Sequence, residues 1–325
     1  MSESADLPEV HILLTVYNGM PFLEEQIRSL QAQTHTRWRL WVRDDGSSDG
    51  TLEALGALAH RDPRIIAVES EGARLGASAG FGWLLEHAAP DADYVMFCDA
   101  DDSWLPRKIE LTISAMQSAE RLQPHQEDPG PVLVHTDLTV VDGNLQVTAD
   151  SFWHFEGISP QPVRLNRLLV HNTVTGCTVM INRALRRLAT PVPREAVMHD
   201  WWLALVASCF GRIVSVESPT TLYRQHGGND TGARYYPRGL TDTVTRTLKV
   251  ASRRDRVRQS LDRSARQAAA LLERFGKDLS PEQHRLISRY AEIPDCGSFA
   301  RKLRLIQLRT LSQGWDRSLG LILRA

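Results

Sequence analysis

Three carboxylates lie in one short segment of the chain, MFCDADD, at Asp99, Asp101 and Asp102. They follow the apolar run at residues 94–97, so they stand at the end of an expected buried strand. Carboxylates this close repel one another unless positive charge lies between them. Convergent oxygen ligands suit a hard divalent cation, Mg²⁺ or Mn²⁺, which keeps positions open for substrate phosphates. A solvated acidic turn is the competing interpretation, and for this motif taken alone it is the better one.

A second acidic pair, after an earlier strand, makes a ligand site a better interpretation of the acidic motif than a solvated turn. Asp44 and Asp45 open the turn DDGSSDGT after the apolar stretch WRLWV, and their oxygens could accept hydrogen bonds from a nucleobase or a ribose hydroxyl. Ordinary turn chemistry is the alternative for this pair. Asp200, in the segment MHDWW, stands at the start of an expected helix, where the helix dipole favours its ionised form. There it could act as a general base toward a hydroxyl nucleophile, or simply stabilise its own helix.

Alternating strands and helices must position these groups. We expect strands at residues 10–16, 38–42 and 64–69 and in the segment DYVMFCDADD, and helices from Pro21 and at 51–60, 76–87 and 106–121. This alternation predicts a parallel α/β sheet with helices on both faces. Ligands of such sheets bind outside the carboxyl ends of the strands. The ends of the first, second and fourth strands should therefore share one edge that carries residues 15–18, 44–45 and 99–101.

After residue 125 the order of elements changes. We expect strands at 132–142, 176–181 and 211–217, and helices at 182–188 and 200–209. From about residue 238 the pattern is helical and rich in arginine, with amphipathic helices expected within 244–275 and 299–325.

The net charge of −1 hides an asymmetry along the chain. Residues 234–325 hold 20 Lys and Arg against 9 Asp and Glu, a net of +11, whereas residues 1–233 hold 18 against 30, a net of −12. A basic tail suggests an anionic partner, which could be a membrane surface, nucleic acid or the acidic body itself. Nucleic acid is not expected, because the arginines are not interleaved with exposed aromatic residues.

The last segment suits a helix lying on anionic lipid, although ordinary helix packing explains it equally well. Its apolar residues are interleaved with basic ones: Leu303, Leu305, Ile306, Leu308 and Leu311 with Lys302, Arg304 and Arg309. The chain has no run of about 18 apolar residues and no signal-peptide layout at MSESADLPEV, so we expect a cytoplasmic protein with peripheral membrane contact at most. Four cysteines without a CxxC pair indicate buried thiols rather than a zinc site.

Several of these segments together resemble the inverting family 2 glycosyltransferases. The resemblance runs from VHILLTVYNGMPFLEEQIRSLQAQTHTRWRLWVRDDGSSDGT through DYVMFCDADDSWLPRKIE to MHDWWLALVASCFGRIVSVESPTTLYRQHGGN, with the motifs in the family's order over about residues 9–230. The last stretch is similar to bacterial rhamnosyltransferase-like members. The resemblance implies the GT-A fold, a Rossmann-like mixed sheet with helices on both faces. It divides the chain into a GT-A domain at 1–235, with nucleotide and acceptor halves at 1–125 and 126–235, and a basic helical region at 236–325.

Carried over to matching positions, the resemblance also implies roles for single residues. Nucleotide contacts would come from Thr15, Val16, Tyr17, Asn18, Asp44, Asp45, Arg74, Asp99 and Ala100. Asp101 would bind Mg²⁺ or Mn²⁺, with Asp99 and the later His226. Asp200 would be the catalytic base. From the residues themselves we expect one of Trp201 and Trp202 to stack on the acceptor sugar and the other to pack in the core. The backbone of Gly176 and Cys177 could line the acceptor side, although a tight turn explains this pair equally well. The family often has Glu-Asp where this chain has His199-Asp200.

The resemblance implies a metal-dependent inverting enzyme that moves a sugar, for example L-rhamnose from dTDP-rhamnose, to a glycan or glycolipid acceptor in surface polysaccharide biosynthesis. A nucleotidyltransferase that makes a nucleotide sugar is one alternative, but it would need a glycine-rich basic loop that YNGM does not provide. A non-catalytic protein that binds nucleotide or sugar is the other. The presence of Asp99, Asp101 and Asp200 together argues against it.

Overall fold

A mixed sheet forms the centre of the protein. The computed structural model describes residues 7–69, 74–88, 92–122, 129–160, 163–226 and 254–310, with Ser318, Leu321, Ile322, Arg324 and Ala325. In this part of the chain the strands are β1 (Val10–Val16), β2 (Trp38–Asp44), β3 (Ile65–Val68), β4 (Tyr94–Cys98), β5 (Ser103–Trp104), β6 (Val132–Val141), β7 (Val147–Ala149), β8 (Met180–Asn182) and β9 (Arg212–Arg224). Their order in the sheet is β3-β2-β1-β4-β8-β6-β9-β5, with β7 beside β6.

The expected parallel arrangement is confirmed for the first half of the chain and gives way to a mixed one in the second. Strands β3, β2, β1 and β4 run parallel, whereas β8 is antiparallel to both β4 and β6. β6 and β9 then pair in parallel. The carboxyl ends of β1, β2 and β4 consequently share one edge of the sheet, as predicted from the sequence.

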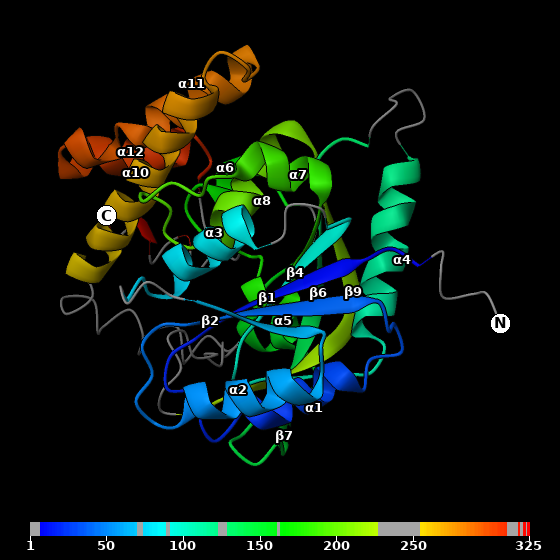
Figure 1. Cartoon of the computed structure of the whole chain (residues 1–325). Coiled ribbons are helices and arrows are strands. Elements are labelled where there is room, and N and C mark those ends of the chain that lie inside the picture. The colour runs from blue at the N-terminus through cyan, green and yellow to red at the C-terminus, as the bar shows by residue number, and fades with distance from the viewer. Residues whose placement is uncertain are drawn as a thin grey trace.

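Helices cover both faces of this sheet (Figure 1). One face carries α1 (Leu23–Gln31), α2 (Thr51–Arg61) and α4 (Lys108–Arg121). The other face carries α3 (Ala77–His87), α7 (Arg183–Ala189) and α8 (His199–Phe210), with the shorter α6 (Leu165–Leu168). The short α5 (Phe152–Glu156) packs beside β6, where the ring of Trp153 contacts that of His135. Along β1, Ile12 and Leu14 pack toward the first layer and Leu13 toward the second. Burial on both faces explains why this strand is an unbroken apolar run.

Two element boundaries differ from the expectation. The expected strand at 176–181 begins instead with a 3-10 turn, η1 (Gly176–Thr178), because the Thr178 hydroxyl and amide both donate to the carbonyl of Thr175. Strand β9 continues to Arg224, beyond the expected end at 217, because it pairs with β6 over its whole length. Its carboxyl end thereby reaches the edge that carries the acidic motif.

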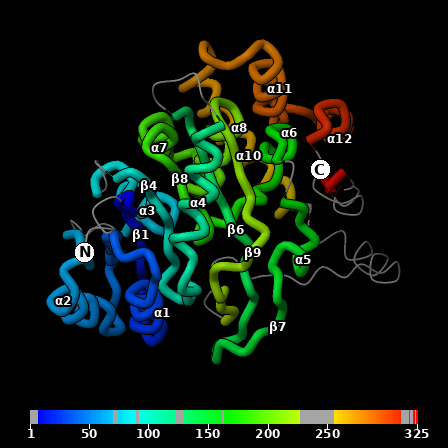
Figure 2. The backbone as a smooth tube through the Cα atoms, turned by 90° about the vertical axis from the view of Figure 1, so that its right-hand side faces the viewer, coloured from blue at the N-terminus to red at the C-terminus, as the bar shows by residue number. Residues whose placement is uncertain are grey.

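The C-terminal helices pack against the helix layer around α8 and not directly on the sheet (Figure 2). They are α10 (Arg254–Phe275), α11 (Pro281–Ala291), a short turn η3 (Ile293–Asp295) and α12 (Ser298–Gln307). The buried side chains of α10 belong to the same core as α8, and the rings of Trp202 and Phe275 are 6.2 Å apart. The predicted domain boundary near residue 235 lies outside the described residues and stays a prediction.

Helix α11 is absent from the elements expected from the sequence, although its start is marked there. Ser280 and Gln283 form a reciprocal capping box around Pro281 at the first turn.

The apolar residues of the amphipathic helix expected within 299–325 do not all lie on an exposed face. Leu305 is fully buried and Leu308 is partly buried against the core, whereas Leu303 and Ile306 are exposed, and Leu311 lies outside the described residues. Within the described part of the chain, every helix is too short or too polar to span a membrane.

A glycine at the junction of α8 and β9 allows the close approach of two segments. A Cβ built on Gly211 would lie 1.9 Å from the carbonyl oxygen of Pro131, far inside van der Waals contact.

We expect Gly211→Ala to lower the free energy of unfolding by on the order of 3 kcal/mol, because the backbone must shift to make room for the added methyl group. The matched control is Gly56→Ala, an exposed position inside α2 with open space around it, which should stabilise the protein by about 0.5–1 kcal/mol. Urea denaturation measures both changes, and an unchanged midpoint for Gly211→Ala would contradict the assigned packing.

Candidate active site

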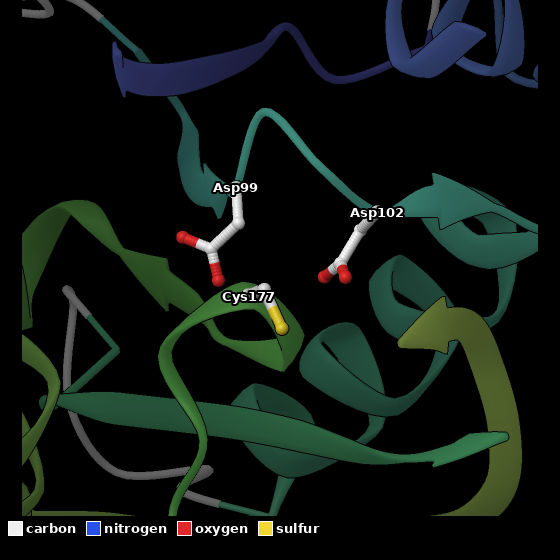
Figure 3. Close-up of side chains that lie close together, drawn as sticks. All are labelled: Asp99, Asp102 and Cys177. Carbon is white, nitrogen blue, oxygen red and sulfur yellow. The ribbon is translucent and has the colours of Figure 1, made fainter. Parts of the chain in front are cut away.

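The acidic motif forms the loop between β4 and β5. Asp99 follows β4 and Asp102 precedes β5, and Figure 3 shows both carboxylates pointing toward the turn that holds Cys177. One ligand atom of each of these three residues lies within 4.8 Å of the others. Burial raises the pKa of the Cys177 thiol well above its usual range, so the sulfur stays protonated. A neutral thiol is a poor ligand for a hard cation, so this trio alone is not a convincing metal site.

Lys108, at the start of α4, supplies the positive charge that the acidic loop needs. Its ammonium is fully buried and donates to the carbonyl of Cys177 at 2.7 Å and to the Thr221 hydroxyl at 2.5 Å. Burial lowers its pKa to about 8, an effect that the nearby thiols and carboxylates, including Asp102 and Asp99, oppose. It is therefore mostly cationic at neutral pH. The sequence reasoning missed this residue, although a lysine in line with Thr112 and Met116 on a buried helix face was a usable signal.

Arg224, at the end of β9, ties a second chain segment to the same loop. Its backbone N–H donates to the Asp102 carboxylate at 3.1 Å, and its Nε donates to the carbonyl of Asp101 at 2.8 Å. Its remaining guanidinium nitrogens donate to the Gly143 carbonyl and to Glu25. The arginine side chain is buried, so these contacts act with little screening by solvent.

That anchor brings His226 to the acidic motif. The Nε2 of His226 is 2.8 Å from Oδ2 of Asp101, and its ring packs against Phe22 at 4.9 Å. Both side chains are about one quarter exposed, so the pair is open to a ligand. A carboxylate oxygen and an imidazole nitrogen next to each other, with Asp99 two positions away, are a donor set that fits Mn²⁺ or Mg²⁺. The structure thus brings two of the three predicted metal ligands, Asp101 and His226, into contact, whereas the carboxylate of Asp99 lies with Asp102 and Cys177. The role of all three as metal ligands stays a prediction.

The two carboxylates at the end of β2 have different surroundings. Asp45 accepts hydrogen bonds from Arg43 and from the N–H groups of Leu75 at 2.9 Å and Gly76 at 2.7 Å. Burial opposes ionisation of Asp45, but these donors still hold its pKa below the usual value. It is fully engaged in anchoring the segment before α3. Asp44 uses Oδ2 to accept from the N–H groups of the following turn, whereas its buried Oδ1 accepts no hydrogen bond from the described residues.

Residues 15–18 line the same edge. The carbonyl of Val16 accepts from the N–H of Asp45 at 2.8 Å, and Asn18 exchanges hydrogen bonds with the turn after β2. Asn18 has a φ of 51°, a left-handed conformation that asparagine tolerates. The guanidinium of Arg74 stacks on the exposed ring of Tyr17, with its Cζ 3.6 Å from the ring centroid.

Two other predicted nucleotide residues lie beside glycines at this edge. The side chain of Thr15 faces Gly80 of α3, and the methyl of Ala100 faces Gly19. Because neither glycine carries a side chain, the segments can approach closely: a Cβ on Gly80 would lie 2.6 Å from Oγ1 of Thr15, and one on Gly19 would lie 2.5 Å from Cγ2 of Val16. All nine predicted nucleotide positions therefore fall on one edge of the sheet, which is necessary for their proposed role.

Asp200 lies in the first turn of α8 and is 7% exposed. Burial raises its pKa to about 7, against the opposing effect of hydrogen bonds from the N–H groups of Trp201 and Gly176 and from Asn172. Burial thus opposes the ionised form that the helix dipole favours, and at this position its effect is the larger. Burial and the negative charges of Asp101 and Asp200 also raise the pKa of Asp99, which places Asp200 close to the acidic loop.

The residues predicted on the acceptor side, two tryptophans and a glycine–cysteine turn, have different surroundings. Trp201 and Trp202 are both buried, and their indole N–H groups donate to the carbonyls of Leu168 and Ala189. Neither ring is placed to stack on a sugar, so the expectation for one of them is corrected. The cause is that α8 is apolar all round and packs between the sheet and α10. Gly176 and Cys177 do lie against the site. The N–H of Gly176 donates to the carboxylate of Asp200, and the carbonyl of Cys177 accepts from the ammonium of Lys108.

The chain is similar to several known proteins. The family described as glycosyl transferase family 2 matches residues 11–188, more than half of the chain. A curated relative, the UDP-Glc:alpha-D-GlcNAc-diphosphoundecaprenol beta-1,3-glucosyltransferase WfgD of Escherichia coli, is 29% identical over 54% of this chain and 61% of its own length. The dTDP-rhamnosyl transferase RfbG of Shigella flexneri is 24% identical over 68% of this chain and 74% of its own length. The first of these matches thus spans less than two thirds of the relative.

Among solved structures, residues 1–349 of TarS from S. aureus in complex with UDP-GlcNAc superpose with a TM-score of 0.54 at 15% sequence identity. The superposition covers 97% of this chain and 90% of that one. At this identity the likeness shows the fold alone. The family match and the shared fold lead to one conclusion: this chain is a member of glycosyl transferase family 2, an enzyme family, and has the expected GT-A fold.

Proposed function

We propose that this chain transfers a sugar from a nucleoside-diphosphate sugar to a hydroxyl of a glycan or lipid-linked glycan, with inversion at the anomeric carbon. The observation that carries the proposal is the meeting of two sites at one sheet edge. The acidic loop with Asp101 and His226 suits a diphosphate and its cation, and the buried carboxylate of Asp200 suits a general base. The Asp99 carboxylate lies within 4.8 Å of the Cys177 sulfur, and the preceding residue, Gly176, lies against Asp200, so both carboxylates flank the same turn.

The donor site follows from groups whose hydrogen bonding is incomplete. Asp44 has one buried oxygen free of described partners, so it, rather than the fully engaged Asp45, would accept a hydrogen bond from the base. The stacked pair of Tyr17 and Arg74, with its exposed tyrosine ring, would lie beside the nucleotide. Asp101 and His226 would hold a divalent cation, which supplies neutralisation of the leaving diphosphate.

Asp200 would take the proton of the acceptor hydroxyl as the bond to the anomeric carbon forms and the bond to the diphosphate breaks. Its raised pKa makes it a stronger base than an ordinary aspartate. A direct displacement on the face opposite the leaving group needs no covalent intermediate and inverts the configuration. Gly176 and Asn172 would keep the carboxylate oriented through their hydrogen bonds.

The names of the relatives suggest the substrates. RfbG is named a dTDP-rhamnosyl transferase, and WfgD is named for a UDP-Glc donor and a diphosphoundecaprenol-linked acceptor. We propose a nucleotide sugar such as dTDP-rhamnose as donor and a lipid-linked glycan of surface polysaccharide assembly as acceptor. A nucleotidyltransferase and a non-catalytic binding protein remain the rivals, and the experiments below distinguish them.

Nucleotide binding gives the first test. In calorimetric titrations with dTDP, UDP and GDP, each with Mn²⁺ and with EDTA, we expect metal-dependent binding of one nucleotide. Asp101→Ala should weaken that binding by about tenfold to a hundredfold, because it removes a cation ligand. Asp278→Ala, which removes an exposed carboxylate between α10 and α11, is the matched control and should bind like wild type. If none of the nucleotides binds, the donor-site assignment is wrong, and a non-catalytic binding protein becomes the better interpretation of the chain.

The base gives the second test. With a functional donor and acceptor, Asp200→Asn should lower kcat by about a hundredfold to ten thousandfold while leaving the Kd of the nucleotide unchanged. Since the base must be ionised and its pKa is about 7, wild-type activity should fall as pH drops below 7 and level off above about 8. The residual activity of Asp200→Asn should lack this acidic limb. An unaltered pH profile in the variant would exclude Asp200 as the base.

We also propose that α12 touches an anionic membrane. Phe299, Leu303 and Ile306 recur at helical spacing and are 82%, 46% and 48% exposed, with Lys302 beside them. Such an apolar stripe with basic neighbours suits the interface of an anionic bilayer, where a lipid-linked acceptor would reside.

Vesicle sedimentation tests this contact. Wild type should bind vesicles that contain phosphatidylglycerol more strongly than pure phosphatidylcholine. Joint replacement of Phe299, Leu303 and Ile306 by serine should weaken binding at least about tenfold, because it removes the inserting side chains. Leu122→Ser, which changes an equally exposed leucine after α4, is the control and should have no effect. Equal binding of all three proteins would contradict the proposal.

A further inference from the structure

We propose that His199 positions the acceptor, by hydrogen bonding through its imidazole to a sugar hydroxyl held beside the carboxylate of Asp200. This inference rests on the proposed function, since it needs an acceptor that presents hydroxyl groups to Asp200. It assigns a task to a buried side chain that the chemistry described so far leaves unused.

His199 is buried without the partners that a buried imidazole normally has. It is 2% exposed, and neither ring nitrogen hydrogen bonds to any described residue. Its ring packs against the rings of Phe81, with centroids 4.2 Å apart, and Phe97, with centroids 4.7 Å apart, and neither offers a polar group. Leaving a buried donor or acceptor without a hydrogen bond is destabilising, so such a group calls for an explanation.

The position of the ring supplies that explanation. The point where a Cβ on Gly176 would stand is 3.3 Å from Nε2 of His199 and 3.3 Å from Oδ2 of Asp200. The unsatisfied nitrogen of His199 and the carboxylate of Asp200 therefore both lie against Gly176. This glycine has no side chain and is only partly buried, so a ligand that approaches over Gly176 would meet both groups.

The chemistry of the two groups indicates what they hold. Burial lowers the pKa of His199 to about 3, so the ring is neutral and carries one N–H donor and one acceptor nitrogen. A carboxylate only accepts hydrogen bonds, whereas a neutral imidazole can donate as well. A sugar with neighbouring hydroxyls could donate from one to Asp200 and use the next one to satisfy Nε2 of His199. Two contacts of this kind would fix which hydroxyl meets the base.

The simpler alternative is that His199 only fills space between two phenylalanines. His135 provides the comparison, because it too is fully buried, lacks described partners at both nitrogens and packs on an aromatic ring, that of Trp153. What distinguishes His199 is its position against Gly176 and Asp200. The two histidines therefore make a matched pair for experiment.

The experiment compares His199→Phe, His199→Gln and His135→Phe with wild type. Donors are dTDP-rhamnose and UDP-glucose, acceptor probes are the methyl glycosides of glucose, N-acetylglucosamine and rhamnose, and products are followed by mass spectrometry. His199→Phe should raise the KM for the acceptor about tenfold, as expected for one lost hydrogen bond, with an unchanged nucleotide Kd and a Tm no lower than wild type. His199→Gln should recover part of the affinity, and His135→Phe should keep the wild-type KM.

A second variant covers the case in which His199→Phe does not fold. Gly176→Ala places a methyl group at the shared spot and should likewise raise the acceptor KM without altering nucleotide Kd. The inference is overturned if His199→Phe or Gly176→Ala keeps the wild-type acceptor KM, or if His135→Phe raises it equally. A wild type that binds no nucleotide and glycosylates no probe would instead refute the proposed function, and this inference with it.

Discussion

The accumulation of negative charge on the loop between β4 and β5 is the constraint on which the rest of the site depends. Asp99, Asp101 and Asp102 lie on that loop, and Asp200 approaches it from α8. Little water is available to screen them, since Asp102 and Asp200 are buried. The chain compensates with two buried cations from distant segments, Lys108 of α4 and Arg224 of β9. Both reach the loop region through hydrogen bonds to backbone carbonyls.

These cations also decide how the two halves of the protein meet. Lys108 contacts the carbonyl of Cys177 and the hydroxyl of Thr221, so the turn η1 and strand β9 are held against the acidic loop. Arg224 places the following residues within reach of Asp101. The antiparallel strand β8 makes this possible, because it reverses direction beside β4 and delivers η1 to the edge where the parallel strands end. A wholly parallel sheet would have put that turn elsewhere.

Burial gives the two residues at the start of α8 unusual properties. Removal from water outweighs the helix dipole at Asp200, so its pKa lies near neutrality. The same burial keeps His199 neutral. A base of moderate strength next to a neutral imidazole differs from the simple ionised carboxylate that the sequence position suggests. It is better suited to accept a proton from a hydroxyl than to attract a cation.

The sequence by itself determined the order of strands and helices, the sheet edge that carries the acidic motifs, and the family. These follow from local periodicity, from turn residues and from the rule that parallel strands end at one edge. It did not reveal Lys108 as a counter-ion, the different environments of Asp44 and Asp45, or the burial of Trp201 and Trp202. Those were decided by the tertiary structure, because desolvation and hydrogen-bond saturation depend on segments that are far apart in the chain. A carboxylate looks the same in a sequence whether its oxygens are engaged or free, and only the packing around it settles which chemistry it can perform.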